Sequence, residues 1–303
     1  MRGQAVRGVK LPPPAMVPTM QHASGTLRAH DGLTLFTRRW WPDRPARAVV
    51  LLVHGIAEHS GRYAYPAAHL LLHDVAVLAY DQRGHGQSEG PRTHVDAFGE
   101  YVDDLDRALA WARAEAGGLP LFLMGHSLGG LVVARYVVDR RPEGLAGVIL
   151  SSPALQIPAD LSPLLQRVSG VVSRLAPRLR TVRLDLSLLS RDPAVGRAYA
   201  EDPLCDKKGV RARLGHEILA TTRHVRAHPE AFTAPLLLFH GTADRITDPA
   251  GSRWLYDHTP ATDKTLNLYD GFYHETMNEP ERERVLDDLV AWIHARSGTS
   301  PTP

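Results

Sequence analysis

The stretch LPLFLMGHSLGGLVVARYVV, residues 119–138, decides the fold of this chain. Leu121 to Met124 is a short continuous apolar run, which is typical of a strand buried on both faces of a parallel sheet. The residues from Gly130 to Val138 carry a helical apolar pattern. Between the two, glycines flank Ser127 in a turn too tight for larger side chains, which is how a G-x-S-x-G sequence presents a nucleophilic serine. The alternative for such a motif standing alone is a surface Gly/Ser turn.

Composition and charge are those of an ordinary globular protein. The chain has 303 residues, of which 44% are apolar and 22% are charged, so it can bury a substantial core. Its formal net charge of +2 gives no reason to expect a nucleic-acid partner. Cys205 is the only cysteine, which excludes an internal disulfide, and we interpret it as a structural residue. Neither a cofactor nor a metal ion is predicted.

Residues 1–21 are predicted to be a disordered extension. Three basic residues precede the run Leu11–Pro14, whose prolines interrupt the apolar segment that a signal peptide requires. No stretch approaches the roughly 18 apolar residues that span a bilayer. We therefore expect a cytoplasmic protein, and Met20 is a second candidate for the start of the chain.

Strands and helices alternate along most of the chain. Apolar runs predict strands at residues 33–41, 48–53, 75–80, 121–124, 147–150, 235–239 and 265–269, with helical patterns between most of them. This alternation predicts the α/β fold class, with a mostly parallel sheet and right-handed crossovers. From Ala154 to about Phe232 the pattern is helical, with no convincing strand. We therefore predict a core over residues 22–153 and 232–298, interrupted by a helical cap, or lid, over residues 154–231.

A serine hydroxyl becomes a nucleophile only when a base removes its proton and a third group orients that base. In open α/β sheets, functional groups gather beyond the carboxyl ends of the strands. Asp244 lies in the loop after the strand 235–239, and His274 lies after the strand 265–269. Because the order Ser, Asp, His is the one expected for this arrangement, we predict the catalytic triad Ser127, Asp244 and His274.

Other residues compete for these roles. Asp248 and Asp270 are alternatives to Asp244, although Asp270 precedes a glycine and fits a turn. The chain has 16 histidines, and a loop histidine is most often exposed or a local hydrogen-bonding group. We interpret His240 and His258 in this way.

Attack by the serine places negative charge on the former carbonyl oxygen, and two preorganised main-chain amides are expected to face it. Leu128, directly after the serine, supplies one amide. The second is expected from the loop after the strand 48–53, where the donor is the amide of Ile56. These two amides form the predicted oxyanion hole, and His54 is interpreted as a brace for the loop.

The sequence resembles the monoacylglycerol lipase family of α/β-hydrolases, from about residue 25 to residue 296. The motifs that carry the likeness are HGIAEHSGRY at 54–63, DQRGHGQSEG at 81–90, GHSLGG at 125–130, GTADRI at 241–246 and YDGFYH at 269–274. The cap adds LSLLSRD at 186–192 and EDPL at 201–204. The resemblance implies an α/β-hydrolase fold and a serine hydrolase that releases a fatty acid from monoacylglycerol through an acyl-enzyme intermediate.

The same resemblance implies a polar end of the site, where glycerol is held. Glu58 and Arg62 would line it, and Tyr199 would approach it from the cap. The alternative for Glu58 and Arg62 is an ion pair that only holds the loop. The chain departs from the family pattern at residues 56–57, where vertebrate members have smaller residues, and at Met277, where some relatives have a histidine.

The predicted cap combines an apolar helical face with positive charge. The apolar residues of that face are Leu161, Leu164, Leu165, Val168, Val171, Val172 and Leu175, and Arg167, Arg174 and Arg178 lie mainly elsewhere. Residues 154–233 hold 13 Lys and Arg against 8 Asp and Glu. The face is predicted to line an acyl tunnel or to pack on the core. Transient contact of the cationic cap with an anionic membrane surface, hence a peripheral location, is a second hypothesis.

A small lipid ester is the expected partner, and the sequence gives no oligomeric state. Two other functions stay open. A lysophospholipase or a broad carboxylesterase would need a pocket for a larger or charged head group. A non-catalytic ligand receptor on the same fold would bind its ligand without turnover, and the complete triad argues against it.

Overall fold

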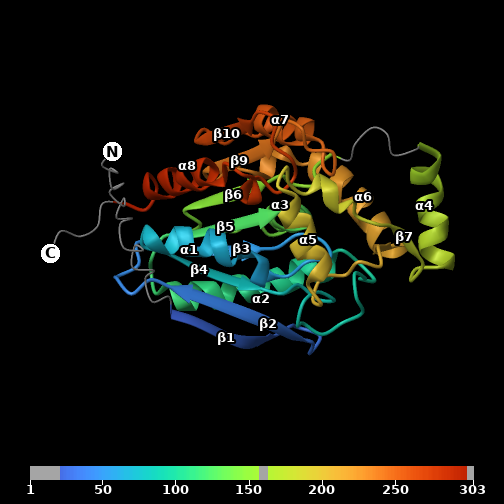
Figure 1. Cartoon of the computed structure of the whole chain (residues 1–303), viewed down its shortest axis with the longest axis horizontal. Coiled ribbons are helices and arrows are strands. Elements are labelled where there is room, and N and C mark those ends of the chain that lie inside the picture. Colours follow the sequence, from blue (N-terminus) through green and yellow to red (C-terminus); the bar gives the residue numbers. More distant parts are fainter. Residues whose placement is uncertain (1–20, 157–162, 299–303) are drawn as a thin grey trace, which may run out of the picture.

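A central sheet of eight strands runs through the molecule, in a computed structural model that describes residues 21–156 and 163–298 (Figure 1). The strands are β1 Gln21–Arg28, β2 Thr34–Trp41, β3 Ala48–Val53, β4 Val75–Tyr80, β5 Leu121–His126, β6 Gly147–Ser151, β9 Leu236–Gly241 and β10 Lys264–Tyr269. They lie in the order β1-β2-β4-β3-β5-β6-β9-β10. All neighbouring pairs are parallel except β1 with β2 and β2 with β4. The predicted α/β class with a mostly parallel sheet is confirmed.

Helices cover both faces of the sheet. Helices α1 Ala64–Leu72 and α8 Arg282–His294 cover one face, and α2 Gly99–Ala116, α3 Leu128–Arg140 and α7 Pro249–His258 cover the other. Because side chains alternate along a strand, β3 contributes to two cores. Val50 and Leu52 pack with Leu70 and Leu286, whereas the intervening residues of β3 pack against α2 and α3.

The insertion between β6 and β9 contains α4 Pro163–Leu175, α5 Pro193–Glu201 and α6 Ala212–Arg226. Helix α6 contacts both α3 of the core and α4, which stands at one end of the molecule, away from the sheet (Figure 1). Two short strands, β7 Arg180–Val182 and β8 Val210–Arg211, pair antiparallel in this segment. The expectation of no strand here is wrong, because runs of three and two residues are too short to show a period in sequence.

Strand β1 is not predicted from the sequence, because its eight residues contain one large apolar side chain, Leu27. The extension predicted for residues 1–21 lies outside the described residues except for Gln21. Short 3₁₀ turns occur at η1 Ser60–Tyr63, η2 Leu186–Leu188, η3 Pro229–Ala231 and η4 Thr276–Asn278. No helix in the described part of the chain has the length and apolar character needed to cross a bilayer.

Candidate active site

The turn between β5 and α3 holds Ser127 in strained backbone. Its φ of 54° and ψ of −116° lie where L residues are rare, and its amide donates to Ser151 O at 3.0 Å. A Cβ at position 125 would lie 2.3 Å from Gly129 O, and one at position 129 would lie 2.1 Å from Val53 O. Glycine is therefore required on both sides of the serine, and the strand–turn–helix geometry predicted around Ser127 is the one observed.

The loops after β9 and β10 bring Asp244 and His274 to this serine. His274 Nε2 lies 2.9 Å from Ser127 Oγ, and His274 Nδ1 lies 2.7 Å from Asp244 Oδ2. All three residues are buried. A hydroxyl, an imidazole and a carboxylate within hydrogen-bonding distance in this order form the arrangement that nucleophilic catalysis by serine requires.

The competing aspartates have other partners. Asp248 caps the N-terminus of α7 by accepting from the Ala250 amide at 2.9 Å. Asp270 is exposed and accepts from the Thr242 hydroxyl at 3.1 Å, as expected for turn chemistry. Asp244 is therefore the carboxylate in contact with His274.

His240 is part of the same network, although the sequence gives it only a local role. Its ring is fully buried, with Nε2 3.0 Å from Asp244 Oδ2 and Nδ1 2.8 Å from Ser252 Oγ. Thr247 Oγ1 also donates to Asp244 Oδ2 at 3.0 Å, and the amides of Ile246 and Thr247 donate to Oδ1. These contacts hold the carboxylate in place. The position of His240, at the end of the strand that leads to Asp244, is the signal that could have identified it.

Charge in this network favours an ionised Asp244 and a basic His274. Burial alone would raise the pKa of Asp244, but the rings of His274 and His240 outweigh it and hold the pKa far below its ordinary value. Burial alone would lower the pKa of His274, and the Asp244 carboxylate reverses this, so the pKa of His274 is raised. His126, whose ring centroid lies 4.9 Å from that of His274, has its pKa lowered to about 3 by burial and by His274. It is therefore neutral when His274 accepts a proton.

The two predicted amide donors belong to Ile56 and Leu128, which line the same cavity as Ser127. Leu128 begins α3, so its N–H is one of the first-turn amides that have no partner within the helix. Ile56 lines the space beside Ser127, in a loop whose Gly55 amide donates to Glu58 Oε1 at 2.5 Å. His54 also contacts this loop, with Nδ1 2.7 Å from Gly55 O.

Glu58 and Arg62 form a buried ion pair near the serine. Arg62 Nη1 lies 2.5 Å from Glu58 Oε2, and the Tyr63 hydroxyl donates to Glu58 Oε1 at 2.7 Å. Burial alone would raise the pKa of Glu58, but the Arg62 guanidinium outweighs it and lowers the pKa to about 2. A third charged residue, Glu275, joins this pair through Arg62 and is not identified from the sequence. The alternative from the sequence is that Glu58 and Arg62 form an ion pair that only holds the loop. The structure contains this ion pair, and Glu58 also accepts from the Gly55 amide of the loop.

Tyr199 connects the cap to the same loop. Its hydroxyl donates to Ala57 O at 2.7 Å, and the Arg62 guanidinium lies 4.9 Å from the centroid of its ring. Ala57 itself has a positive φ of 61°. Met277 is buried beside Glu58, Arg62 and other residues of this polar side.

A cavity of about 260 Å³ adjoins Ser127 on the side of the cap. Apolar residues dominate its wall: Ile56, Leu128, Ala154 and Ile246 from the core, and Val172, Val182, Val210, Ala212, Ile218 and Leu219 from the cap. Of the face predicted to line an acyl tunnel, Val172 lines this cavity. Residues 161–162 of that prediction lie outside the described residues, and the side chains of residues 163–168 are not described.

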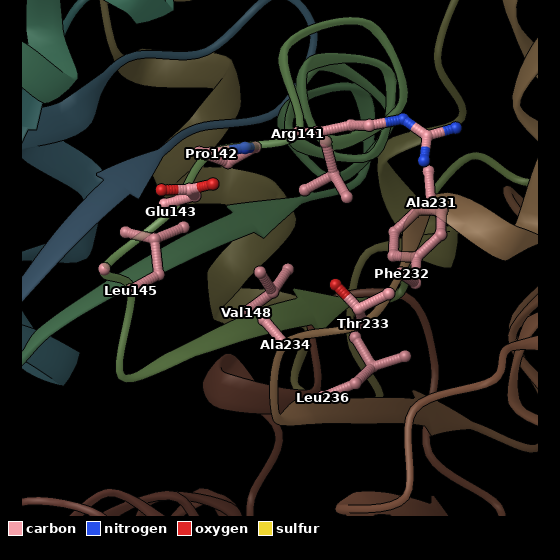
Figure 2. A pocket seen from close by; sticks show the side chains of 12 residues that line it. Arg141, Pro142, Glu143, Leu145, Val148, Ala231, Phe232, Thr233, Ala234 and Leu236 are labelled. Carbon is pink, nitrogen blue, oxygen red and sulfur yellow. The ribbon is translucent and has the colours of Figure 1, made fainter.

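A larger cavity of about 390 Å³ lies elsewhere (Figure 2). It is found where α3 ends and where the chain enters β6 and β9, with Val148, Phe232 and Leu236 in its wall. None of the predicted site residues lines it. Because ligands of parallel sheets bind beyond the carboxyl ends of the strands, the smaller cavity at Ser127 is the candidate active site.

Two groups of side chains in the described part of the chain are close enough to share a metal ion. They are His59, Asp202 and Cys205, and His69, His73 and Asp287. Neither group contains a residue of the Ser127 network. Cys205 packs in a small apolar cluster with Leu189 and Tyr199, and burial raises the pKa of its thiol to about 12, which favours the neutral form.

Comparison with known proteins identifies the family. A family model described as serine aminopeptidase, S33, matches residues 44–281. A monoacylglycerol lipase of Mycolicibacterium smegmatis is 39% identical over 254 residues, which cover 84% of this chain and 90% of that protein. A human monoglyceride lipase is 37% identical over 276 residues, which cover 90% of each chain. The chain belongs to the monoacylglycerol lipase family.

Solved structures of monoacylglycerol lipases agree with this assignment. The crystal structure of the Paleococcus ferrophilus monoacylglycerol lipase gives a TM-score of 0.77 at 36% identity, covering 86% of this chain and 99% of that one. A monoglyceride lipase of Saccharomyces cerevisiae gives a TM-score of 0.81 at 24% identity, which supports the fold alone. The resemblance inferred from the motifs is confirmed, and so is the α/β-hydrolase fold. As a member of the monoacylglycerol lipase family, the protein is a carboxylic ester hydrolase.

Proposed function

We propose that this protein hydrolyses monoacylglycerols to a fatty acid and glycerol, with Ser127, His274 and Asp244 as its catalytic triad. The observation that carries the proposal is the Ser127–His274–Asp244 chain of contacts, with an apolar cavity on one side of the serine and a buried polar cluster on the other. An ester with one long apolar part and one small hydroxylated part matches both sides. The relatives named monoacylglycerol lipases support the same substrate class.

The geometry supports a two-step acyl transfer. Ser127 Oγ attacks the ester carbonyl carbon while His274 Nε2 takes the hydroxyl proton, and Asp244 stabilises the imidazolium. The amides of Leu128 and Ile56 donate to the oxyanion, and losing one such donor costs roughly 3 kcal/mol of barrier. His274 then gives the proton to the departing glycerol oxygen. Water, deprotonated by His274, attacks the acyl carbon, and the bond from that carbon to Ser127 Oγ breaks as His274 returns the proton to Oγ, which releases the fatty acid and restores the serine.

The two sides of the serine serve the two parts of the substrate. The apolar cavity takes the acyl chain, and each buried methylene adds roughly 0.8 kcal/mol of gross binding. Glu58, Arg62 and Tyr199 are assigned to the glycerol end, because all three line a small space of about 10 Å³ that borders Ser127 and His274. Their mutual contacts do not compete with this role, since a carboxylate that holds a loop keeps further acceptor capacity.

The cap is also proposed to touch anionic lipid surfaces transiently. Val171, Leu175, Leu179 and Val182 expose 58%, 82%, 53% and 49% of their surface, and Arg174 and Arg178 lie in the same part of the chain. Apolar side chains with flanking arginines suit a peripheral contact with an anionic bilayer. Co-sedimentation with anionic vesicles is the measurement. Unchanged binding after Arg174 and Arg178 are replaced by glutamine would contradict the contact.

Parallel rates with matched esters test the proposed function. The wild-type protein should hydrolyse monoacylglycerol faster than the lysophospholipid and the p-nitrophenyl ester of the same acyl chain. A fluorophosphonate probe should label the wild type but not Ser127→Ala. Labelling without turnover of any ester would indicate a receptor, and faster turnover of the lysophospholipid would indicate a lysophospholipase.

A further inference from the structure

Glu275, directly after His274, is a charged residue beside the serine to which neither the sequence motifs nor the triad assigns a role. Its two carboxylate oxygens accept from Arg62, with Nη1 2.7 Å from Oε1 and Nη2 2.8 Å from Oε2. Asn278 Nδ2 also donates to Oε2 at 2.8 Å. Glu275 is 5% exposed, and its amide donates to Leu189 O of the cap at 2.7 Å. The side chain is therefore fixed from several directions.

Glu275 gives this cluster an excess of negative charge. Glu58 and Glu275 share one guanidinium, which contacts both carboxylates. All three side chains line the small cavity of about 10 Å³ that also contains Ser127 and His274, and among the described residues of its wall Arg62 is the one Arg or Lys. A phosphate or carboxylate on the alcohol part of an ester bound at Ser127 would lie beside two carboxylates and a guanidinium that is already paired.

We propose that Glu275 is a specificity-determining residue that makes the leaving-group side of the site accept uncharged, hydroxylated alcohols and reject anionic ones. This inference rests on the proposed function, since it concerns the alcohol released from the ester. Carboxylate oxygens accept hydrogen bonds from hydroxyl groups, so a polyol finds partners here. A phosphate monoester at neutral pH offers acceptors and negative charge, and like charges at short range in a poorly solvated site repel strongly. Rejection of an unwanted ligand through an unfavourable charge is a common source of specificity.

The test compares two esters that share one acyl chain. These are 1-dodecanoylglycerol and 1-dodecanoylglycerol 3-phosphate, and the quantity is the ratio of their kcat/KM values. Glu275→Gln keeps the shape of the side chain and removes its charge. It should move the ratio toward the phosphate ester by about tenfold or more. Glu283→Gln removes a charge from an exposed position of α8 and should leave the ratio unchanged.

A ratio that Glu275→Gln leaves within about twofold of wild type, or an equal loss on both esters, overturns the proposal and assigns Glu275 a structural role. Inhibition of the wild type provides a test that needs no variant. The ether analogue 1-O-dodecylglycerol should inhibit about tenfold or more strongly than its 3-phosphate, and equal inhibition overturns the proposal. Failure of the wild type to hydrolyse 1-dodecanoylglycerol at all would instead contradict the proposed function.

Discussion

Ser127 lies between two regions that are built in opposite ways. On one side, loops of the core hold Glu58, Arg62 and Glu275 in a network whose polar atoms contact one another at 2.5–2.8 Å. On the other side, the inserted cap contributes Val172, Leu219 and other residues to the wall of an apolar cavity. The first region depends on directional contacts, and the second depends on shape and apolar area.

This difference implies that the two regions control two different properties: the rate of catalysis and the preference for acyl chain length. A buried polar network has one satisfied arrangement, and the loss of one partner leaves another group unpaired. An apolar cavity tolerates changes that keep its volume. We therefore expect changes in the core loops to affect esters of every acyl chain length alike, whereas changes in the cap should alter the preference among acyl chains.

Ser127→Ala is expected to have the largest effect, because both regions serve this hydroxyl. Turnover should fall by about a millionfold for esters of every chain length. Initial rates with monoacylglycerols at high enzyme concentration measure this loss. Ser24→Ala, on the exposed edge strand β1, is the control and should match the wild type. A residual turnover above about a hundredth of the wild-type value would exclude Ser127 as the nucleophile.

Asp244→Asn is expected to rank second. The amide would keep the shape of the side chain but would not stabilise the imidazolium, and the comparable change in a serine protease costs about ten-thousandfold in kcat. Asp270→Asn, in the exposed turn after β10, should change kcat by less than about twofold. Equal effects of the two substitutions would contradict the assignment of Asp244.

The dependence of kcat/KM on pH tests the core-loop region, because it reports the protonation of His274. His274 must be neutral to act as a base, so kcat/KM should fall as the pH drops through its pKa. Because Asp244 raises that pKa, the acid limb should lie above the ordinary histidine value of 6.5. In Asp244→Asn the residual activity should have its midpoint at lower pH. A profile that is flat from about pH 5 to pH 8 would contradict this role of His274.

The sequence predicts most of the core region, and the reason is local. Ser127 directly follows β5, Asp244 and His274 lie in the loops just after β9 and β10, and apolar runs make those strands recognisable. The partners of these residues are harder to predict, because they are distant in the chain. Arg62 and Glu275 are 213 residues apart, so nothing in the local pattern connects them.

The cap is less predictable for a different physical reason. Its strands β7 and β8 have three and two residues, and its cavity is formed by short segments that meet only in three dimensions. The residues of the apolar face predicted for α4 have different surroundings: Val172 lines the cavity, whereas Val171 and Leu175 are exposed. Helical periodicity identifies an apolar face, and it does not tell which neighbour covers each residue.

Gly215→Phe tests the apolar region alone. Gly215 lies on α6 in the cavity wall, and a Cβ built there meets no atom within 4 Å. The added ring should fill part of the acyl cavity and lower kcat/KM for dodecanoyl esters by about tenfold, with acetyl esters nearly unaffected. Gly99→Phe adds the same side chain at an exposed, open position of α2 and is the control. An equal loss on short and long esters would show that the cap does not select by chain length.

Tyr199→Phe is expected to have the smallest effect, because Tyr199 joins the two regions and reacts with nothing itself. It removes the hydrogen bond from the cap to Ala57 O, although the Asp206 amide still donates to that carbonyl at 2.9 Å. The free energy of unfolding should therefore fall by only about 1 kcal/mol.

The neighbouring Ile56 amide would be held less firmly in Tyr199→Phe, so kcat should fall about threefold with little change in KM. Tyr136→Phe is the matched control, since the Tyr136 hydroxyl on α3 donates to Asp106 of α2 at 2.8 Å and does not line the cavity at Ser127. Both variants should lose similar stability in thermal unfolding, and equal kcat values in the two would show that the cap does not support the oxyanion loop.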